Sequence, residues 1–100
     1  MTDVSKASFT IEHESNDTKG RYVVELNGGK AEMTYSKAGD SMIIIDSTEV
    51  PDVMRGQKVG FALVAKAVED VRLSGKKIMP LCPFAKAQFA RHSEWHDVLL

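Results

Sequence analysis

The sequence predicts a single α+β domain over residues 1–100, with the element order ββββ–α–β–α. Three observations support this class. The first half alternates apolar and polar residues with the period of strands, and from residue 57 the apolar residues recur with the period of a helix. A short apolar segment, residues 76–81, then separates two helical segments. Because a strand–helix–strand crossover follows an antiparallel meander, we expect a mixed sheet with helices packed on it.

Four segments of the first half carry the composition or the alternation of strands. They are residues 8–14, 21–27, 30–37 and 41–50. In the first of them, Phe9 and Ile11 alternate with polar residues, so one face is apolar. The Asn-Gly-Gly sequence at residues 27–29 predicts a tight hairpin, because both central residues of a type I′ turn need positive φ.

The first helix is predicted over residues 57–73. Its apolar positions follow a helical stripe and are Val59, Leu63, Val64, Ala67, Val68 and Val71. Gly75 predicts the end of this helix, since glycine tolerates the left-handed conformation found there. In the strand that follows, Pro80 lacks an N–H, so this strand cannot pair fully on both sides.

A second helix is predicted over residues 83–92, with Pro83 at its first position and Cys82 near its N-cap. Residues 93–100 predict a short closing segment, packed by Trp95 and the two terminal leucines. Trp95 and Phe84 are interpreted mainly as core residues, although Phe84 could also contact a ligand.

The composition narrows the class of protein. Lys and Arg number 13 and Asp and Glu number 14, a balance that argues against nucleic acid as a partner. No stretch approaches the ~18 apolar residues of a membrane span, so we expect no membrane partner. The first residues do not form a secretory signal, and Cys82 is the single cysteine, which together favour a cytoplasmic protein. We expect a monomer or a weak dimer.

The segment Arg-Gly-Gln-Lys-Val-Gly, residues 55–60, predicts an anion site. It lies at the start of the first helix, where backbone N–H groups lack internal partners and the helix dipole is positive. Gly56 and Gly60 would let a ligand approach the backbone closely, and Arg55 and Lys58 add charge. The spacing fits neither the Walker A nor the dinucleotide-binding pattern. The alternative interpretation is a helix start in which Gly56 only turns the chain.

Two longer segments resemble a known family. Val-Pro-Asp-Val-Met-Arg-Gly-Gln-Lys-Val-Gly-Phe-Ala-Leu, residues 50–63, resembles the acetyl-CoA loop of the GNAT superfamily of N-acyltransferases. Residues 75–95 resemble a branch of small single-domain GNAT-like acetyltransferases, which carry Cys-Pro-Phe after the fifth strand and Arg-His-x-Glu near the end. The resemblance implies acetyl-CoA or CoA, bound where the strand ending at Val50 splays from the strand over residues 76–81.

The resemblance also implies positions for the ligand. Val50 would pair with the pantetheine arm through its backbone, and Met54 would lie beside that arm. The pyrophosphate would be wrapped by Arg55, Gly56, Gln57, Lys58, Val59 and Gly60. The second helix, from Pro83 and Phe84 through Phe89, would line the other side. The sequence departs from the family at Lys58, where a glycine is usual, and at Ser47, where the branch commonly has a histidine.

Cys82 and Glu49 are the candidate catalytic residues. A thiol at a helix N-terminus could protonate the departing CoA or accept the acyl group transiently, although free cysteines are also common core residues. Glu49 is the candidate base for the amine, with a solvated carboxylate as the alternative. By strand alternation, we expect Glu49 and Ser47 on one face and Asp46 on the other. No metal is expected, because His92 and His96 have no evident third ligand.

These features together predict an acetyl-CoA-dependent N-acetyltransferase with a primary amine acceptor, in a protein, a peptide or a small molecule. The acceptor side is expected to be open, because the helical pair that follows the first strand in larger relatives is missing. The alternatives are a CoA-binding module without catalysis, which Lys58 and Ser47 favour, and an interaction domain without a ligand.

Overall fold

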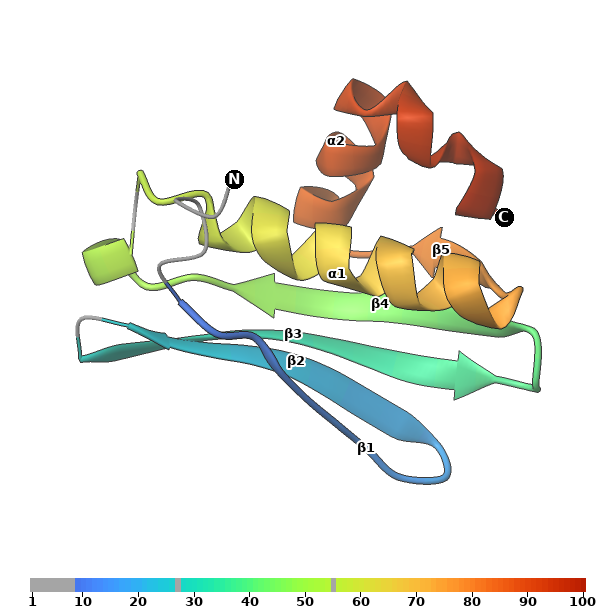
Figure 1. Ribbon diagram of the computed structural model, residues 1–100, viewed down its shortest axis with the longest axis horizontal. Coiled ribbons are helices and arrows are strands. Elements are labelled where there is room, and N and C mark those ends of the chain that lie inside the picture. Colours follow the sequence, from blue (N-terminus) through green and yellow to red (C-terminus); the bar gives the residue numbers. More distant parts are fainter. Residues whose placement is uncertain (1–8, 27, 55) are drawn as a thin grey trace.

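The computed structural model describes residues 9–26, 28–54 and 56–100, which form a sheet covered on one face by helices (Figure 1). The strands are β1 (Glu12–Ser15), β2 (Lys19–Leu26), β3 (Gly29–Ala38), β4 (Met42–Glu49) and β5 (Lys77–Pro80). The helices are α1 (Val59–Ser74) and α2 (Pro83–Arg91), with 3₁₀ turns η2 (Asp52–Met54) and η3 (Ser93–Val98). Below, the inner face of the sheet is the face that carries the helices, and the outer face is the opposite one.

The mixed sheet predicted from the sequence is confirmed. Its strand order is β1-β2-β3-β4-β5; the first four strands are antiparallel, and β5 runs parallel to β4. Leu26 pairs with Gly29, which leaves the predicted two-residue hairpin loop, although Asn27 lies outside the described residues. The first strand is shorter than predicted and starts at Glu12. Phe9 and Ile11 are instead partly buried against the core, and Ser8 lies outside the described residues.

A β-bulge in β4 changes which side chains face the helices. Thr34 of β3 pairs with Ser47, but its neighbour Tyr35 pairs with Ile45, so Asp46 is an extra residue. Asp46 accepts a hydrogen bond from Ser36 at 2.7 Å on the outer face, where Ser47 also lies, 2.9 Å from the Thr34 hydroxyl. The expectation that Asp46 faces away from Ser47 and Glu49 is therefore wrong, because the inserted residue resets the alternation.

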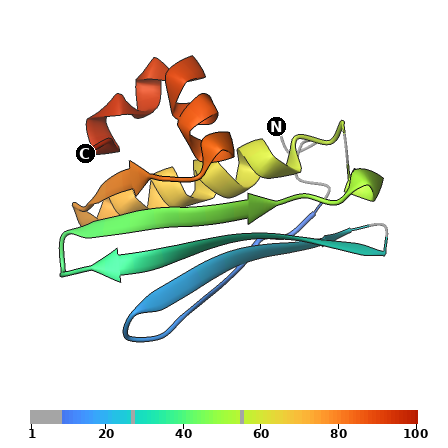
Figure 2. The same ribbon diagram turned by 180° about the vertical axis from the view of Figure 1, so that it is seen from behind.

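The pairing between β4 and β5 ends early, and the two strands then diverge. Ile45 and Pro80 form the last pair, while β4 continues to Glu49 (Figure 2). The carbonyl oxygen of Ile45 accepts hydrogen bonds from the amides of Leu81 at 3.0 Å and Cys82 at 3.2 Å. Beyond this point the chain turns into α2, so the predicted splayed strand pair is present.

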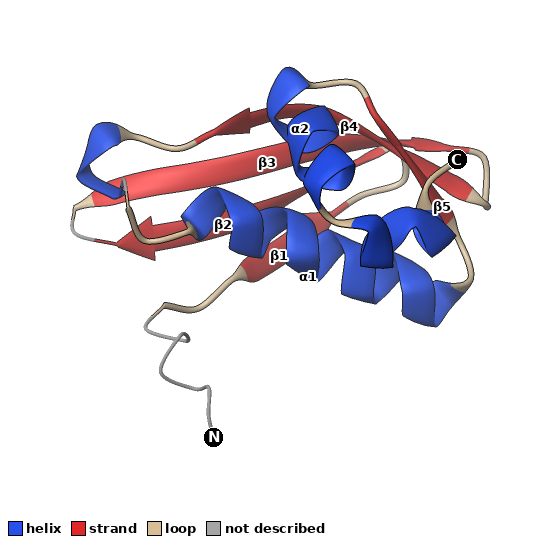
Figure 3. Cartoon of the chain, turned by 90° about the horizontal axis from the view of Figure 1, so that it is seen from above, coloured by secondary structure: helices blue, strands red, loops and turns tan. Residues whose placement is uncertain are grey.

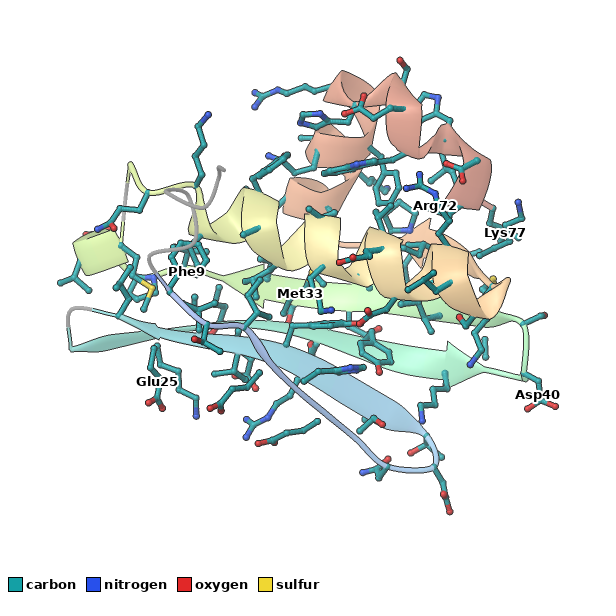
Figure 4. The ribbon with its side chains drawn as sticks, in the orientation of Figure 1. Phe9, Glu25, Met33, Asp40, Arg72 and Lys77 are labelled. Atoms are coloured by element: carbon teal, nitrogen blue, oxygen red, sulfur yellow. The ribbon has the colours of Figure 1, made fainter. Side chains whose placement is uncertain are left out.

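The core lies between the inner face and α1, and both α1 and α2 cover that face (Figure 3). Met33 points from β3 toward α1, whereas Glu25 points away on the outer face (Figure 4). All six apolar positions predicted for the α1 stripe are buried, and Gly75 ends the helix with a φ of 73°. None of the helices in the described part of the chain has both the length and the apolar character needed to cross a bilayer.

A polar network fastens α1 to the first two strands. The Tyr22 hydroxyl donates to Asp70 of α1 at 2.8 Å, and Lys66 lies 3.2 Å from the other oxygen of that carboxylate. His13 stacks on Tyr22 with ring centroids 4.1 Å apart, and its Nε2 lies 2.7 Å from the Tyr35 hydroxyl. Burial, followed by the hydrogen bond to Asp70, raises the pKa of the Tyr22 hydroxyl. Burial also raises the pKa of Tyr35.

The last residues close the free edge of β5. Trp95 is buried, and the Arg72 guanidinium contacts the Asp97 carboxylate at 2.6 and 2.8 Å. Arg72 and Lys77 both reach toward this segment (Figure 4). The closing segment is thus packed by Trp95 as predicted, but Leu100 is exposed.

Replacing Tyr22 by Phe tests the polar network. The change should lower the free energy of unfolding by about 1 kcal/mol near neutral pH, because one hydrogen bond is lost. In the folded wild type, Tyr22 and Tyr35 keep their hydroxyl protons above about pH 10, whereas the unfolded chain releases them there. The free energy of unfolding therefore falls as the pH rises. Urea unfolding should show that the free energy of unfolding falls less between about pH 8 and about pH 11 in Tyr22→Phe than in the wild type. Thr34→Val removes a hydroxyl from the outer face and should keep the wild-type slope; an unchanged slope in Tyr22→Phe would contradict the role of this network.

Candidate functional site

A groove follows from the divergence of β4 and β5. Its volume is about 490 Å³, and it lies between the chain from Val50 to Phe61 on one side and α2 on the other. Its lining residues are Val50, Met54, Gly56, Lys58, Gly60, Phe61, Phe84, Gln88, Arg91 and His92. The groove therefore joins the end of β4 to the start of α1 and to one face of α2.

The structure brings six of the expected ligand residues together in this groove. They are Val50, Met54, Gly56, Lys58, Gly60 and Phe84. Gln57 instead lines a hollow beside Phe9 on the other side of Lys58, and Val59 is buried in the core. Pro83 starts α2 but does not line the groove, and Arg55 lies outside the described residues.

Lys58 adopts a left-handed backbone conformation, with φ 59° and ψ 31°. It is the only non-glycine residue with positive φ among residues 9–26, 28–54 and 56–100. A side chain in this conformation costs roughly 1–2 kcal/mol. Lys58 thus takes the conformation for which glycine is suited at this place in the loop.

The start of α1 leaves backbone donors without partners inside the helix. The first intrahelical bond runs from the Ala62 amide to the Lys58 carbonyl at 3.0 Å, so the amides of Val59, Gly60 and Phe61 precede the regular pattern. The side chain of Lys58, the N-cap residue, makes no capping hydrogen bond within the described part of the chain. Positive φ at Gly56 and Lys58, on either side of Gln57, also alternates the hand of the backbone. Such an alternation turns successive N–H groups toward one side and forms an anion-binding concavity.

Gly60 has a structural role that the sequence did not reveal. A Cβ atom at this position would lie 2.5 Å from Cζ of Phe84, so the ring of Phe84 occupies the space above Gly60. The expectation that Gly60 leaves room for a ligand is therefore corrected, since here its missing side chain admits Phe84. This contact brings the first turn of α1 against the first turn of α2.

Cys82 is the N-cap residue of α2. Its sulfur accepts a hydrogen bond from the Ala85 amide at 3.3 Å and lies 3.3 Å from the Thr48 hydroxyl on β4. The side chain belongs to the core and is only 6% exposed. The thiol thus has a structural role, and through Thr48 it is adjacent to the end of β4 that no longer pairs with β5.

Glu49 lies on the other side of the same strand end. It pairs with Glu32 of β3, whose carboxylate contacts Arg21 at 2.7 Å on the outer face. Thr48, the preceding residue, faces inward to Cys82. The two candidate catalytic residues are therefore reached from opposite faces of the sheet.

Gln88 lies in the part of the second helix that was expected to line the ligand, whereas three groove residues were not anticipated: Phe61, Arg91 and His92. The sequence did carry a signal for part of this set, because Phe84, Gln88 and Arg91 are four and three residues apart and so share one face of a helix. His92 packs on Trp95 with ring centroids 4.5 Å apart, and its Nδ1 lies 3.1 Å from Glu94. The pKa of the Glu94 carboxyl is lowered by a hydrogen bond to the backbone of Glu94 itself and then by the contact with His92.

The described residues contain no group of three side chains suited to hold a metal.

A slightly larger hollow, of about 540 Å³, lies on the outer face over β1–β3 and reaches Asp46. Arg21 in this hollow already contacts Glu14 at 2.9 Å and Glu32 at 2.7 Å. This outer hollow also lies away from the start of α1, where the backbone amides lack partners inside the helix. We therefore take the groove beside α1 as the candidate site.

Comparison with known proteins shows the family and supports the fold. The family described as GCN5-related N-acetyl-transferase matches residues 21–98. The chain is also similar to the solution structure of a GCN5-like protein from Staphylococcus aureus, named as a candidate N-acetyltransferase. The two chains are 34% identical with a TM-score of 0.67, and the match covers 89% of this chain and 87% of the other. A search of curated proteins gives no match.

The fold and the match define a GNAT-like domain of the N-acetyltransferase class. The chain belongs to the GCN5-related N-acetyl-transferase family.

The left-handed conformation of Lys58 predicts that Lys58→Gly stabilises the protein. Glycine removes the steric cost but adds freedom to the unfolded chain, so we expect a net gain of up to about 1 kcal/mol in urea unfolding. The matched control is Gln57→Gly, at an exposed neighbour whose φ is not positive, and this variant should be less stable than the wild type. A loss of stability in Lys58→Gly would contradict the assigned backbone conformation.

Proposed function

We propose that the protein transfers an acetyl group from acetyl-CoA to a primary amine. The observation that carries this proposal is the groove that connects the end of β4, beyond its pairing with β5, to the left-handed start of α1. An extended ligand with an anionic group at one end fits this combination. The amide-bearing arm would lie along β4 near Val50 and Met54, and the diphosphate would lie against the first amides of α1.

Acetyl-CoA supplies the acetyl group as a thioester; the amine nitrogen forms the new C–N bond while the C–S bond breaks. A primary amine of the lysine type is mostly protonated at neutral pH, so it must lose a proton before it attacks. Glu49 accepts that proton on the outer face. Backbone N–H groups near Val50 stabilise the charge that develops on the carbonyl oxygen.

Cys82 acts on the inner face in this proposal. Its S–H gives a proton to the departing CoA sulfur, and the Cys82 thiolate takes a proton back from solvent once the products leave. The Thr48 hydroxyl, 3.3 Å from the Cys82 sulfur, can donate a hydrogen bond to that thiolate in the meantime. No covalent acyl-cysteine is needed, because the amine can attack the thioester directly from the outer face. The strand end between Glu49 and Cys82 would thus separate the amine side from the CoA side.

The acceptor is proposed to be exposed, such as a protein terminus, a lysine side chain or a polyamine. Among the described residues, no helix covers the outer face on which Glu49 lies (Figure 2). Carboxylates at Glu32, Asp46 and Glu49 give this part of the face a negative charge that suits a cationic amine.

A CoA-binding module without catalysis is the second candidate. The buried, capping sulfur of Cys82 favours it, because a thiol that already bonds to a helix N-terminus can be purely structural.

Binding and turnover separate these proposals. Saturating acetyl-CoA, at one hundred times its Kd, should raise the free energy of unfolding by about 2.7 kcal/mol, whereas adenosine alone should have little effect. Release of free thiol should then accelerate with at least one of an N-terminal peptide, a lysine peptide and spermidine. Stabilisation without amine-dependent thiol release would favour the CoA-binding module. No stabilisation by acetyl-CoA would contradict both the acetyltransferase and the CoA-binding module.

Substitutions at the strand end test the assigned roles. Glu49→Gln should lower kcat about a hundredfold and shift the pH profile, while the KM for acetyl-CoA changes little. Cys82→Ala should also lower kcat, and Cys82→Ser should recover part of the loss because a hydroxyl can cap the helix and donate a proton. Glu25→Gln, an exposed carboxylate on β2, is the matched control and should behave as the wild type. Full activity in Cys82→Ala would leave Cys82 with its capping role alone.

A further inference from the structure

Lys30 is a primary amine of the chain itself that lies beside Glu49. Every second residue of β3 from Ala31 to Tyr35 is buried on the inner face, so Lys30 and Glu32, which alternate with them, lie on the outer face. Glu32 pairs with Glu49 of β4, and Lys30 precedes Glu32 by two residues, so Lys30 and Glu49 are diagonal neighbours. Diagonal neighbours on one face of a sheet are about 7–8 Å apart, which is within reach of a long side chain.

The start of β3 packs against the chain that follows β4. A Cβ atom at Gly29, the residue before Lys30, would lie 3.1 Å from Cγ of Pro51 and 2.6 Å from Cγ2 of Val53. The register between β3 and β4, continued by two residues beyond its last pair, also places Lys30 opposite Pro51. Lys30 therefore lies next to the turn at which, under the proposed function, the thioester carbonyl is held near Val50.

The amine of Lys30 is open to reaction. Its side chain is exposed, and it forms no ion pair or hydrogen bond within the described part of the chain. Lys19, a second exposed lysine of the outer face, lies toward the other end of the sheet, where it pairs with Ser36. Six positions along β3 separate Ser36 from Lys30, or about 20 Å, so Lys19 is out of reach of the end of β4.

We propose that the protein acetylates its own Lys30. The inference rests on the proposed function, because acetyl-CoA is the donor and Glu49 is the base. The Nζ atom of Lys30 loses a proton to Glu49 and bonds to the acetyl carbonyl carbon, while the bond from that carbon to the CoA sulfur breaks. The sulfur leaves with a proton from Cys82, so the products are acetylated Lys30 and free CoA. The modification removes one positive charge from the acceptor side of the strand end.

The test incubates the full chain with isotopically labelled acetyl-CoA and no added amine, and maps the labelled lysines by peptide mass spectrometry. A digest of the untreated protein first shows which lysines are free to react. Lys30 should be labelled at least about tenfold faster than Lys19, because only Lys30 lies beside Glu49. Lys30→Arg should remove this fast labelling while keeping the positive charge. Glu49→Gln should slow the labelling of Lys30 about a hundredfold and should not change the slow, uncatalysed labelling of Lys19.

Lys19→Arg is the matched control, because it is the same change on the same face, and its Lys30 should be labelled as in the wild type. Urea unfolding should show equal stability for Lys30→Arg and Lys19→Arg. At saturating acetyl-CoA, the rate constant for labelling of Lys30 should stay the same over about a hundredfold dilution of the protein, since the amine and the base belong to one chain.

Two results would overturn the inference and leave the proposed function standing, provided that added amines still accelerate thiol release. One is equal labelling of Lys30 and Lys19, and the other is labelling of Lys30 that slows in proportion to the dilution. Absence of both self-labelling and amine-dependent thiol release in the wild type would overturn the proposed function as well.

Discussion

The end of hydrogen bonding between β4 and β5 is the constraint on which the candidate site depends. Pro80 brings no N–H to the ladder, and the Ile45 carbonyl accepts from Leu81 and Cys82 together before the chain turns away. Pro83 then starts α2 at once, which makes Cys82 the cap of that helix. As a result the last residues of β4 pair with β3 but not with β5. Their side chains face opposite sides of the sheet, with Thr48 beside Cys82 and Glu49 beside Glu32.

The start of α1 is held in a costly conformation by the burial of the rest of the helix. The left-handed backbone of Lys58 costs roughly 1–2 kcal/mol, whereas burial of a single Leu or Val side chain contributes about 1.5–3 kcal/mol. Leu63 and Val64, one turn further along, are completely buried. Packing of α1 therefore outweighs the local strain, and the contact between Phe84 and Gly60 keeps this end of the helix beside α2.

Periodicity in the sequence was sufficient to predict the antiparallel meander, the mixed sheet and both helices, because burial on one face imposes those periods. It could not predict the bulge at Asp46, since one inserted residue leaves no compositional signal and reverses every face that follows. The loop at residues 55–60 could be predicted as a candidate anion site, but the backbone conformation of Lys58 depends on how α1 docks. Arg91 had the right helical spacing from Phe84, yet the face of α2 that meets the groove is decided by tertiary packing.

The β-bridge between Leu99 and Ile78 protects an edge of the sheet. It covers the free side of β5, and the Leu100 amide adds a bond to the Ile78 carbonyl at 2.9 Å. The opposite border of the sheet, β1, is only four residues long and carries Glu12 and Glu14. Short, charged or covered borders are poor templates for strand addition from another molecule. The chain can therefore leave one whole face of its sheet open to solvent without becoming a seed for fibrillar aggregation.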